Sequence, residues 1–183
     1  MTTFSLISLG NPILRGKSRP VAKTRLSSPA FQKFLDKLAK TCVKNKGVGI
    51  AAPQVGKNIR VIVVSVDPAN PRYEGKKYFP LTIVINPKVV SKAEEIKEDW
   101  EGDLSVDLRG LVPRPIACVV TGVDRIGQEV TFNLKNDFHA RVFQHEIDHL
   151  DGVMFLDKVK KKESFCTYEM WKKFWKGKKF DLV

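Results

Sequence analysis

The stretch VFQHEIDHLDG, residues 142–152, contains two of the chain's three histidines, with Glu146 between them. Residues four apart lie on one face of a helix, so His145 and His149 can present two imidazoles to one metal ion. Glu146 lies one position further round the helix, where it can act as a general base without being a ligand. The pattern predicts a metal-binding helix, and an amphipathic helix with two ordinary surface histidines is the alternative.

A catalytic metal site of this kind needs a third protein ligand and an open coordination position. Glu169 lies twenty positions after His149, as in thermolysin-like peptidases, but the Asn that such enzymes place just before their glutamate is absent. The other candidates are His139, the three cysteines and the acidic residues of WEGDLSVD, residues 100–107. Spacing alone does not choose among them.

Strand signals fill the middle of the chain. We expect strands in IRVIVVSV (from Ile59), LTIVIN (from Leu81), IACVVTGV (from Ile116) and EVTFNL, the last two joined by a hairpin at residues 124–127. Strands followed by a late helix that carries the chemistry favour an α+β fold over an alternating α/β fold.

Three helices are expected. Ser28 and Pro29 are suited to begin the first, which buries one apolar stripe. Asn136 or Asp137 can cap the metal-binding helix, which we expect to end at Gly152. The last helix would stop at Gly177 and would use four aromatic residues as its apolar face, namely Phe165, Tyr168, Trp171 and Trp175.

The composition is that of a globular protein, and we expect a single domain over residues 1–183. The hydrophobic content of 43% is near the globular average, and the length is enough to bury a core. No apolar run reaches the length of a membrane-spanning helix, and the first residues do not read as a signal peptide. We therefore expect a cytoplasmic protein without membrane contact. The scattered cysteines give no disulfide framework.

The net charge of +12 is large for this length and favours anionic partners. From Asp157 to the end of the chain there are nine lysines against four acidic residues. This basic tail is suited to docking on RNA, although a solvated lysine-rich surface is an equally simple interpretation.

Three segments in order resemble the three signature motifs of peptide deformylases: GVGIAAPQ (47–54), EGDLS (101–105) and QHEIDHL (144–150). NPILR near the start and LVPRP after the second motif also match. The resemblance implies a catalytic core over about residues 9–156 and a basic, aromatic tail over residues 157–183. It also implies antiparallel and mixed β-sheets packed around a central metal-binding helix, with an N-terminal and a C-terminal helix.

Peptide deformylases remove the N-formyl group from nascent polypeptides, so the resemblance implies a metal-dependent hydrolase acting on N-formylmethionyl chains. The family typically uses Fe²⁺ and often carries Zn²⁺, with Ni²⁺ or Co²⁺ as alternatives in vitro. Its third ligand is the cysteine of the second motif, and Asp103 occupies that position here. The implied ligands are Asp103, His145 and His149, a set that suits zinc or non-haem iron. A carboxylate can also bind through both oxygens, which would occupy the position that the substrate oxygen needs.

The resemblance also implies roles for the residues around the metal. Glu146 would be the general base and then the general acid, and Gln54 with the backbone N–H of Leu104 would stabilise charge on the formyl oxygen. Glu101 and Arg114 would form an ion pair that braces the second motif. The residues expected to bind substrate are Gly47, Val48, Gly49, Gly102, Arg109, Phe138, Arg141 and Val142.

Two charged residues depart from the apolar methionine pocket of the family. Arg141 falls one turn before His145, and Asp99 lies just before the second motif. We expect them to pair across a more polar pocket, or else Arg141 to reach solvent with its charged end.

Two other functions remain open at this point. A divergent deformylase-like protein with Asp103 could act on another N-acyl substrate, or could bind the ribosome through its tail without catalysis. A thermolysin-like peptidase with Glu169 as its third ligand is the second alternative.

Overall fold

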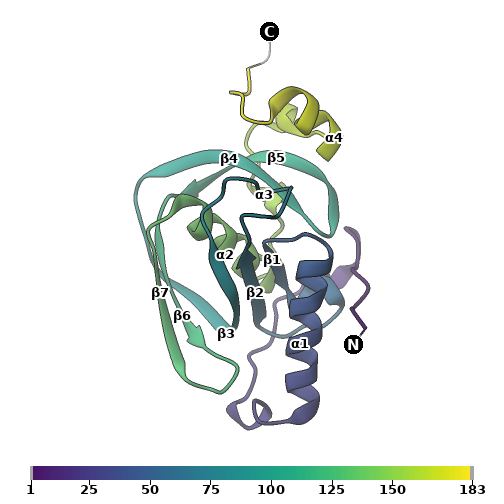
Figure 1. The fold of residues 1–183 in the computed structure, drawn as a ribbon, viewed down its shortest axis with the longest axis vertical. Helices are drawn as coiled ribbons and strands as arrows, with labels where there is room; N and C mark the ends of the chain where they lie inside the picture. Colours follow the sequence, from purple (N-terminus) through teal and green to yellow (C-terminus); the bar gives the residue numbers. More distant parts are fainter. Residues whose placement is uncertain (1, 182–183) are drawn as a thin grey trace.

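The helix with the two histidines, α2 (Asp137–Leu150), lies at the centre of the molecule, which a computed structural model describes for residues 2–181 (Figure 1). It begins after Asn136, whose side chain accepts a hydrogen bond from the His139 N–H. It is followed by Gly152, where φ is +73° and a Cβ would overlap the Arg15 carbonyl, so the position favours glycine. The predicted limits of this helix are confirmed.

A five-stranded antiparallel sheet packs beside α2, with the strand order β1-β2-β3-β6-β7. Its strands are β1 (Gly49–Ala51), β2 (Val61–Val66), β3 (Phe79–Lys92), β6 (Cys118–Val123) and β7 (Glu129–Leu134). The four predicted strands and the hairpin between β6 and β7 are confirmed. β1 lies at one edge of the sheet, where only its β2 side is paired.

Around β2 the sheet is buried on both faces, because a helix covers each of them there. Successive side chains of a strand point to opposite faces. In β2, Val61 and Val63 pack in a core with α1 (Pro29–Lys44), whereas Ile62 and Val64 pack in a core with α2. This double burial explains why β2 reads as a continuous apolar run rather than an alternating one.

The second motif lies on a separate two-stranded ribbon that sequence reasoning did not predict. β4 (Ile96–Asp103) pairs antiparallel with β5 (Val106–Pro115), and the two are joined by a tight turn. β4 reads IKEDWEGD, whose charged residues conceal the strand pattern. The ribbon contacts α2 through β5 and packs on a third core around Val112 and Phe155.

The C-terminal part differs from the predicted last helix. α3 (Phe155–Lys158) is followed by α4 (Tyr168–Met170), which continues as a wide π-helical turn over Trp171–Trp175. Phe165 precedes the helix and packs against Gly110 of β5, so the prediction of one helix including Phe165 is wrong. Residues 182 and 183 of the expected tail, and residue 1 of the expected domain, lie outside the described residues. Within the described part, no helix is both long and apolar enough to cross a membrane.

Candidate metal centre

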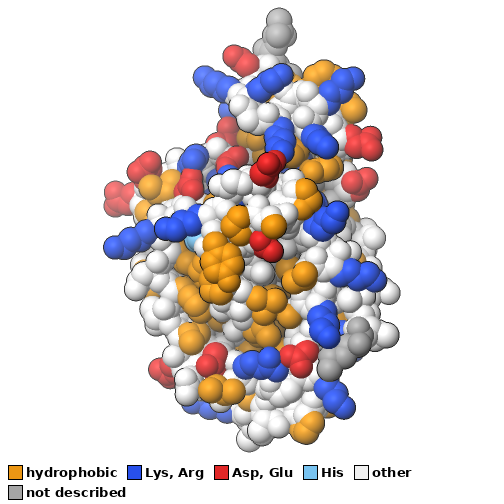
Figure 2. All heavy atoms as spheres, viewed as in Figure 1, with side chains coloured by type: hydrophobic (Ala, Val, Ile, Leu, Met, Phe, Trp, Pro, Cys, Tyr) orange, Lys and Arg blue, Asp and Glu red, His pale blue; other side chains and the backbone are white. Residues whose placement is uncertain are grey.

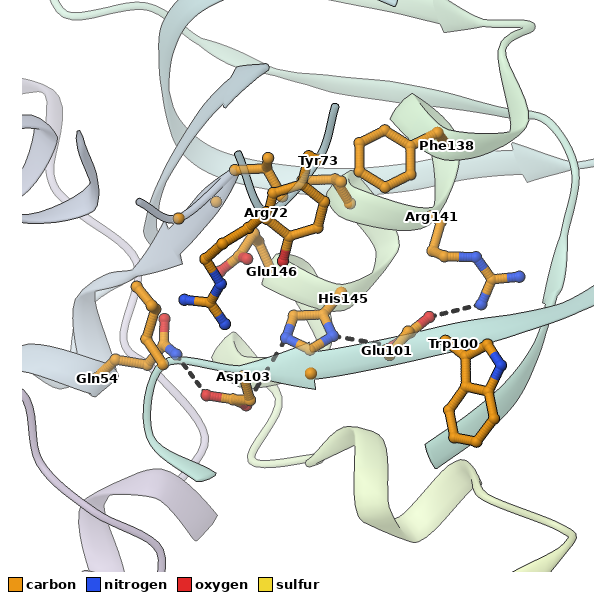
Figure 3. Close-up of a pocket in the computed structure, with 16 residues that line it drawn as sticks. Gln54, Arg72, Tyr73, Trp100, Glu101, Asp103, Phe138, Arg141, His145 and Glu146 are labelled. Atoms are coloured by element: carbon orange, nitrogen blue, oxygen red, sulfur yellow. Dashed lines mark hydrogen bonds and ion pairs between the residues drawn. The ribbon is translucent and has the colours of Figure 1, made fainter. Parts of the chain in front are cut away.

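Asp103, His145 and His149 bring three donor atoms together in a small triangle. Figure 3 shows two of these residues, Asp103 and His145, facing each other. The Nε2 atoms of His145 and His149 are 3.2 Å apart. Asp103 Oδ2 lies 3.7 Å from His145 Nε2 and 3.0 Å from His149 Nε2. Tetrahedral coordination with bonds of about 2.0–2.2 Å requires donor separations of roughly 3.3–3.6 Å. The triangle therefore has the size of one face of such a site.

The hydrogen bonds of Asp103 leave one of its oxygens available. Oδ1 accepts hydrogen bonds from Gln54 Nε2 at 2.8 Å and from the Ser105 N–H at 2.6 Å. Oδ2 is buried and accepts no such bond within residues 2–181. Burial alone would raise the pKa of Asp103, but the two neighbouring histidines hold it well below its usual range. An ionised carboxylate oxygen that faces two imidazoles fits a cation.

Glu101 orients the first histidine ligand. Its Oε2 lies 2.9 Å from His145 Nδ1, which leaves Nε2 of that ring directed to the other donors. Arg114 binds both oxygens of Glu101 at 2.5 and 2.9 Å, and Arg141 binds Oε1 at 2.7 Å. Burial opposes the charge of Glu101, but Arg114 and His145 keep its pKa well below the usual range. Arg114 also donates to Asp148 of α2 at 2.7 Å, so the network joins the ribbon to the helix.

Glu146 lies beside the ligands without being one of them. Its side chain is buried, and its Oε2 has no hydrogen-bond partner among the described residues. Burial raises the pKa of Glu146 to about 7, and the histidines reduce this effect. A Cβ at Gly49 would overlap Glu146 Oε1, so the glycine provides the space that this carboxyl occupies. A group with this pKa can both accept and release a proton near neutrality.

A narrow cavity opens in front of these residues. Most of the predicted substrate-binding residues line it, on three sides: Gly47, Val48 and Gly49 at β1, Gly102 on β4, and Phe138, Arg141 and Val142 on α2. Gln54 and Leu104 line it as well. Arg109 is not among the lining residues, and its side chain instead lies against the far side of Gly102 in a neighbouring cavity.

Three further lining residues were missed by sequence reasoning: Arg72, Tyr73 and Trp100 (Figure 3). The first two belong to the connection between β2 and β3, where no periodicity marks which side chains face a site. The centres of the Tyr73 and Phe138 rings are 5.6 Å apart, so the two rings pack together and close one side of the cavity. Trp100 lies in the unpredicted β4.

The predicted pair of Arg141 and Asp99 is wrong, and so is its alternative. The Arg141 side chain is only 7% exposed, because its guanidinium finds three acceptors inside the protein. These are Glu101 Oε1, the Val112 carbonyl and the Lys97 carbonyl. Asp99 accepts a hydrogen bond from the next backbone N–H instead.

The other candidates for the third ligand lie elsewhere. His139 is in contact with the Lys77 carbonyl through Nε2, and Glu169 belongs to α4. Within the described residues, the one group of potential ligand atoms that come together is that of Asp103. The thermolysin-like interpretation with Glu169 is therefore wrong.

Two histidines and a carboxylate, with a buried carboxyl beside them, define the centre of a metal-dependent hydrolase. Residues 4–165 match the sequence profile of the family described as "Polypeptide deformylase". The chain is 46% identical over 165 residues to "Peptide deformylase 2" of Nostoc sp., with 90% of each protein covered. It is 36% identical to "Peptide deformylase 1" of Nitrosomonas europaea, covering 82% of this chain and 84% of that protein.

A solved structure gives the same result. The class I type b peptide deformylase from Acinetobacter baumannii, in a structure with Met-Ala-Ser bound, superposes with a TM-score of 0.82 at 34% identity. The match covers 86% of this chain and 98% of that one. The chain belongs to the polypeptide deformylase family. The α+β deformylase fold is confirmed, and the relatives favour an enzyme over a binding protein without activity.

Proposed function

We propose that the chain removes the N-formyl group from N-formylmethionyl nascent polypeptides, with Asp103, His145 and His149 holding one Fe²⁺ or Zn²⁺ ion. The triangle of donor atoms beside the buried carboxyl of Glu146, in a chain of this family, is the observation that carries the proposal. When bound, the metal supplies a Lewis acid that polarises the formyl group and favours ionisation of the attacking water.

Glu146 is the proposed proton carrier of the reaction. Its carboxylate takes a proton from the attacking water as the new C–O bond forms at the formyl carbon. It then gives this proton to the methionine nitrogen as the C–N bond breaks, which yields formate and a free amine. The pKa of about 7 supports both steps, and the missing side chain at Gly49 leaves room for the carboxyl.

Gln54 and Leu104 are the proposed donors to the formyl oxygen. One hydrogen of Gln54 Nε2 points to Asp103, and the second is available to the cavity. The Gln54 Oε1 accepts from the Ala51 N–H at 2.8 Å, which fixes the orientation of the amide. In other acyl-transfer enzymes one such donor contributes roughly 10²–10³ in rate.

The open edge of β1 is the proposed track for the substrate backbone. β1 pairs with β2 on one side only, and Val48 and Gly49 line the cavity on the other. A peptide can add there as a further strand, with the methionine side chain between Phe138, Val142 and the stem of Arg141. The proposed partner is therefore an extended, formylated nascent chain, and the cytoplasm, where such chains emerge, is the proposed compartment.

The basic tail is the proposed contact with ribosomal RNA. Lys172, Lys173 and Lys176 are exposed on the C-terminal helical turn. Co-sedimentation with ribosomes at low salt tests this contact, and binding that persists after deletion of residues 167–183 would contradict it.

Turnover of a formyl-methionyl tripeptide amide, measured after anaerobic loading with Fe²⁺, tests the reaction. Metal content is measured in the same samples. We expect turnover by the wild-type chain and a loss of more than about 100-fold in Glu146→Gln at unchanged metal content. Full metal occupancy without wild-type turnover would contradict the proposed reaction.

A further inference from the structure

A second cavity adjoins the metal centre and contains two arginines. Arg72 and the segment Gly102–Leu104 line both cavities, so the two are continuous around that segment. Arg109, Asn45 and Tyr168 line only the second one. The C-terminal segment thus forms a wall of a cleft that begins at the metal ligands.

Arg109 is buried without an anionic partner. The residue is only 4% exposed. Its Nε and Nη2 have no hydrogen-bond partner within residues 2–181. Two rings hold it in place, because Cζ lies 4.2 Å from the ring centre of Trp171 and 5.0 Å from that of Tyr168. Such cation–π contacts orient the guanidinium without using the Nε and Nη2 donors, while the Tyr73 side chain lies beside it.

Arg72 lies on the same ring and lacks an anionic partner too. Its Cζ is 5.3 Å from the Tyr168 ring centre, and its Nε has no partner in the described part of the chain. Its Nη1 makes one long bond, of 3.4 Å, to the Asn45 carbonyl. Neither arginine forms an ion pair with any described residue. Asp107, an exposed acidic residue that lines the same cleft, does not pair with either of them.

Arg72 and Arg109 both lie against the Tyr168 ring, and each has buried donors without a partner, which is costly unless an anion binds nearby. Burial lowers the pKa of Arg109, the neighbouring Tyr73 opposes this shift, and the charge of Arg72 adds to it. The planar guanidinium matches a carboxylate with two parallel hydrogen bonds. The cleft therefore has the chemistry of a carboxylate site.

We propose that Arg72 and Arg109 bind an acidic side chain of the substrate, within the first few residues after the formylmethionine. This inference rests on the proposed function. A peptide whose formyl group lies at the metal ligands passes the segment Gly102–Leu104, and each extended residue advances it by about 3.3 Å. An acidic residue close behind the methionine then reaches the two arginines.

The test compares kcat/KM for formyl-Met-Ala-Glu-Ala-amide and formyl-Met-Ala-Gln-Ala-amide, and for the same pair with the residue moved one position either way. We expect a preference of about tenfold for glutamate at the best position, mainly through KM. The preference should shrink at high salt, because Arg72 is only half-buried and its charge is screened by salt. Equal kcat/KM at all three positions would overturn the proposal.

Two variants locate the effect. Arg72→Gln, at a half-buried position that tolerates the change, should reduce the preference for glutamate to about twofold or less. Arg19→Gln removes the same charge from an exposed position outside both cavities and should keep the full preference. An unchanged preference in Arg72→Gln would overturn the assignment of that residue.

Tripeptides with a free C-terminal carboxylate, compared with their amides, distinguish the source of the anion. The enzyme could prefer the free C-terminal carboxylate over the amide and yet show no preference for glutamate over glutamine. That result would overturn the proposal, because a nascent chain presents side-chain carboxylates and no nearby C-terminus. Turnover of the neutral peptide shows separately whether the proposed function holds, because that substrate does not use the arginines. No turnover of either peptide contradicts the reaction, whereas equal turnover contradicts only the carboxylate site.

Discussion

At the level of single residues, the hydrogen bonds of Asp103 decide how it can bind a metal. Gln54 and the Ser105 N–H both donate to Oδ1, so Oδ2 is the oxygen that faces the two histidines. We therefore expect coordination through one oxygen, which leaves a position for the substrate. A carboxylate that bound through both oxygens would occupy the substrate's coordination position. The hydrogen bonds from Gln54 and Ser105 to Oδ1 oppose such binding, and the motif alone does not reveal them.

Replacing Asp103 by Asn should weaken metal binding. The neutral amide keeps the size of the side chain but removes the charge that faces the imidazoles, so we expect a loss of affinity of more than about 100-fold. Metal content after dialysis against a weak chelator measures it. Asp107→Asn, four positions later at the start of β5 and exposed, is the control and should retain the metal. Equal metal content in both variants would contradict the assignment of the third ligand.

Glu101→Gln should reduce both stability and metal affinity. The change leaves the buried charges of Arg114 and Arg141 without their shared partner, which costs about 3–5 kcal/mol. Urea unfolding in the presence of chelator measures the stability separately from the metal. The control is Glu98→Gln, on the same strand as Glu101. It breaks the exposed ion pair of Glu98 with Lys161 and should lower the free energy of unfolding by less than about 1 kcal/mol. Similar losses in the two variants would refute a special role of the buried network.

Gly49→Ala should reduce turnover while the metal is retained. The three atoms nearest to a Cβ at this position all belong to Glu146, so the change displaces that side chain first. We expect kcat/KM to fall by about 10²-fold or more, the usual contribution of a positioned general base. Metal analysis and peptide turnover on the same sample check it. Wild-type turnover would show that Glu146 tolerates the displacement.

Among the secondary-structure elements, those with a regular apolar pattern could be predicted and the others could not. The spacing of His145 and His149 indicates α2, and the valines of β2 indicate a buried strand, because packing requires both patterns. β4 carries charged residues whose partners, such as Arg114 and Arg141, are distant in the sequence, so no local pattern reveals the strand. Asp103 was assigned as third ligand by resemblance to a family motif.

Arg72 illustrates why part of the site was missed. It lies in a connection, and its place at both cavities follows only from tertiary packing. The last helix shows the same limit. Phe165 has the right spacing to belong to it, but its ring packs on Gly110, where the absent side chain leaves space. Tertiary contact overrides spacing there.

The C-terminal segment should depend on Trp171 for its stability. This residue is 9% exposed and covers Arg109, whereas Phe174, three positions later, is 47% exposed. We expect Trp171→Ala to lower the free energy of unfolding by about 3 kcal/mol and Phe174→Ala by less than about 1 kcal/mol. Urea unfolding measures both. Equal costs would contradict the packing of the segment against β5.

In the molecule as a whole, the tail is tied to the ribbon by backbone and side-chain bonds. The Arg109 N–H donates to the Cys166 carbonyl at 2.7 Å, and the Leu111 N–H donates to Ser164 Oγ at 3.0 Å. These bonds support the proposal that the chain forms one domain. Figure 2 shows lysine and arginine side chains spread over one face of the molecule, in agreement with the net charge of +12.

The proposed metal joins two parts of the fold, because two ligands come from α2 and one from β4. Removal of the metal should therefore lower the melting temperature. At a free metal concentration 100 times the dissociation constant, the stabilisation is about 2.7 kcal/mol. Calorimetry with and without chelator measures the shift, with Asp103→Asn as the control that should show none. An equal shift in that variant would place the metal elsewhere.

The open edge of β1 has a consequence for the protein among its own copies. An unpaired sheet edge is a template for any extended chain, including that of a neighbouring molecule, and long edges of this kind cause aggregation. β1 is only three residues long, so a strand that gains nothing but its backbone hydrogen bonds is held weakly. In the proposed function, a substrate would also be held by its side chains in the adjoining cavities. We therefore expect a second copy of the chain to bind this short edge less well than a substrate does.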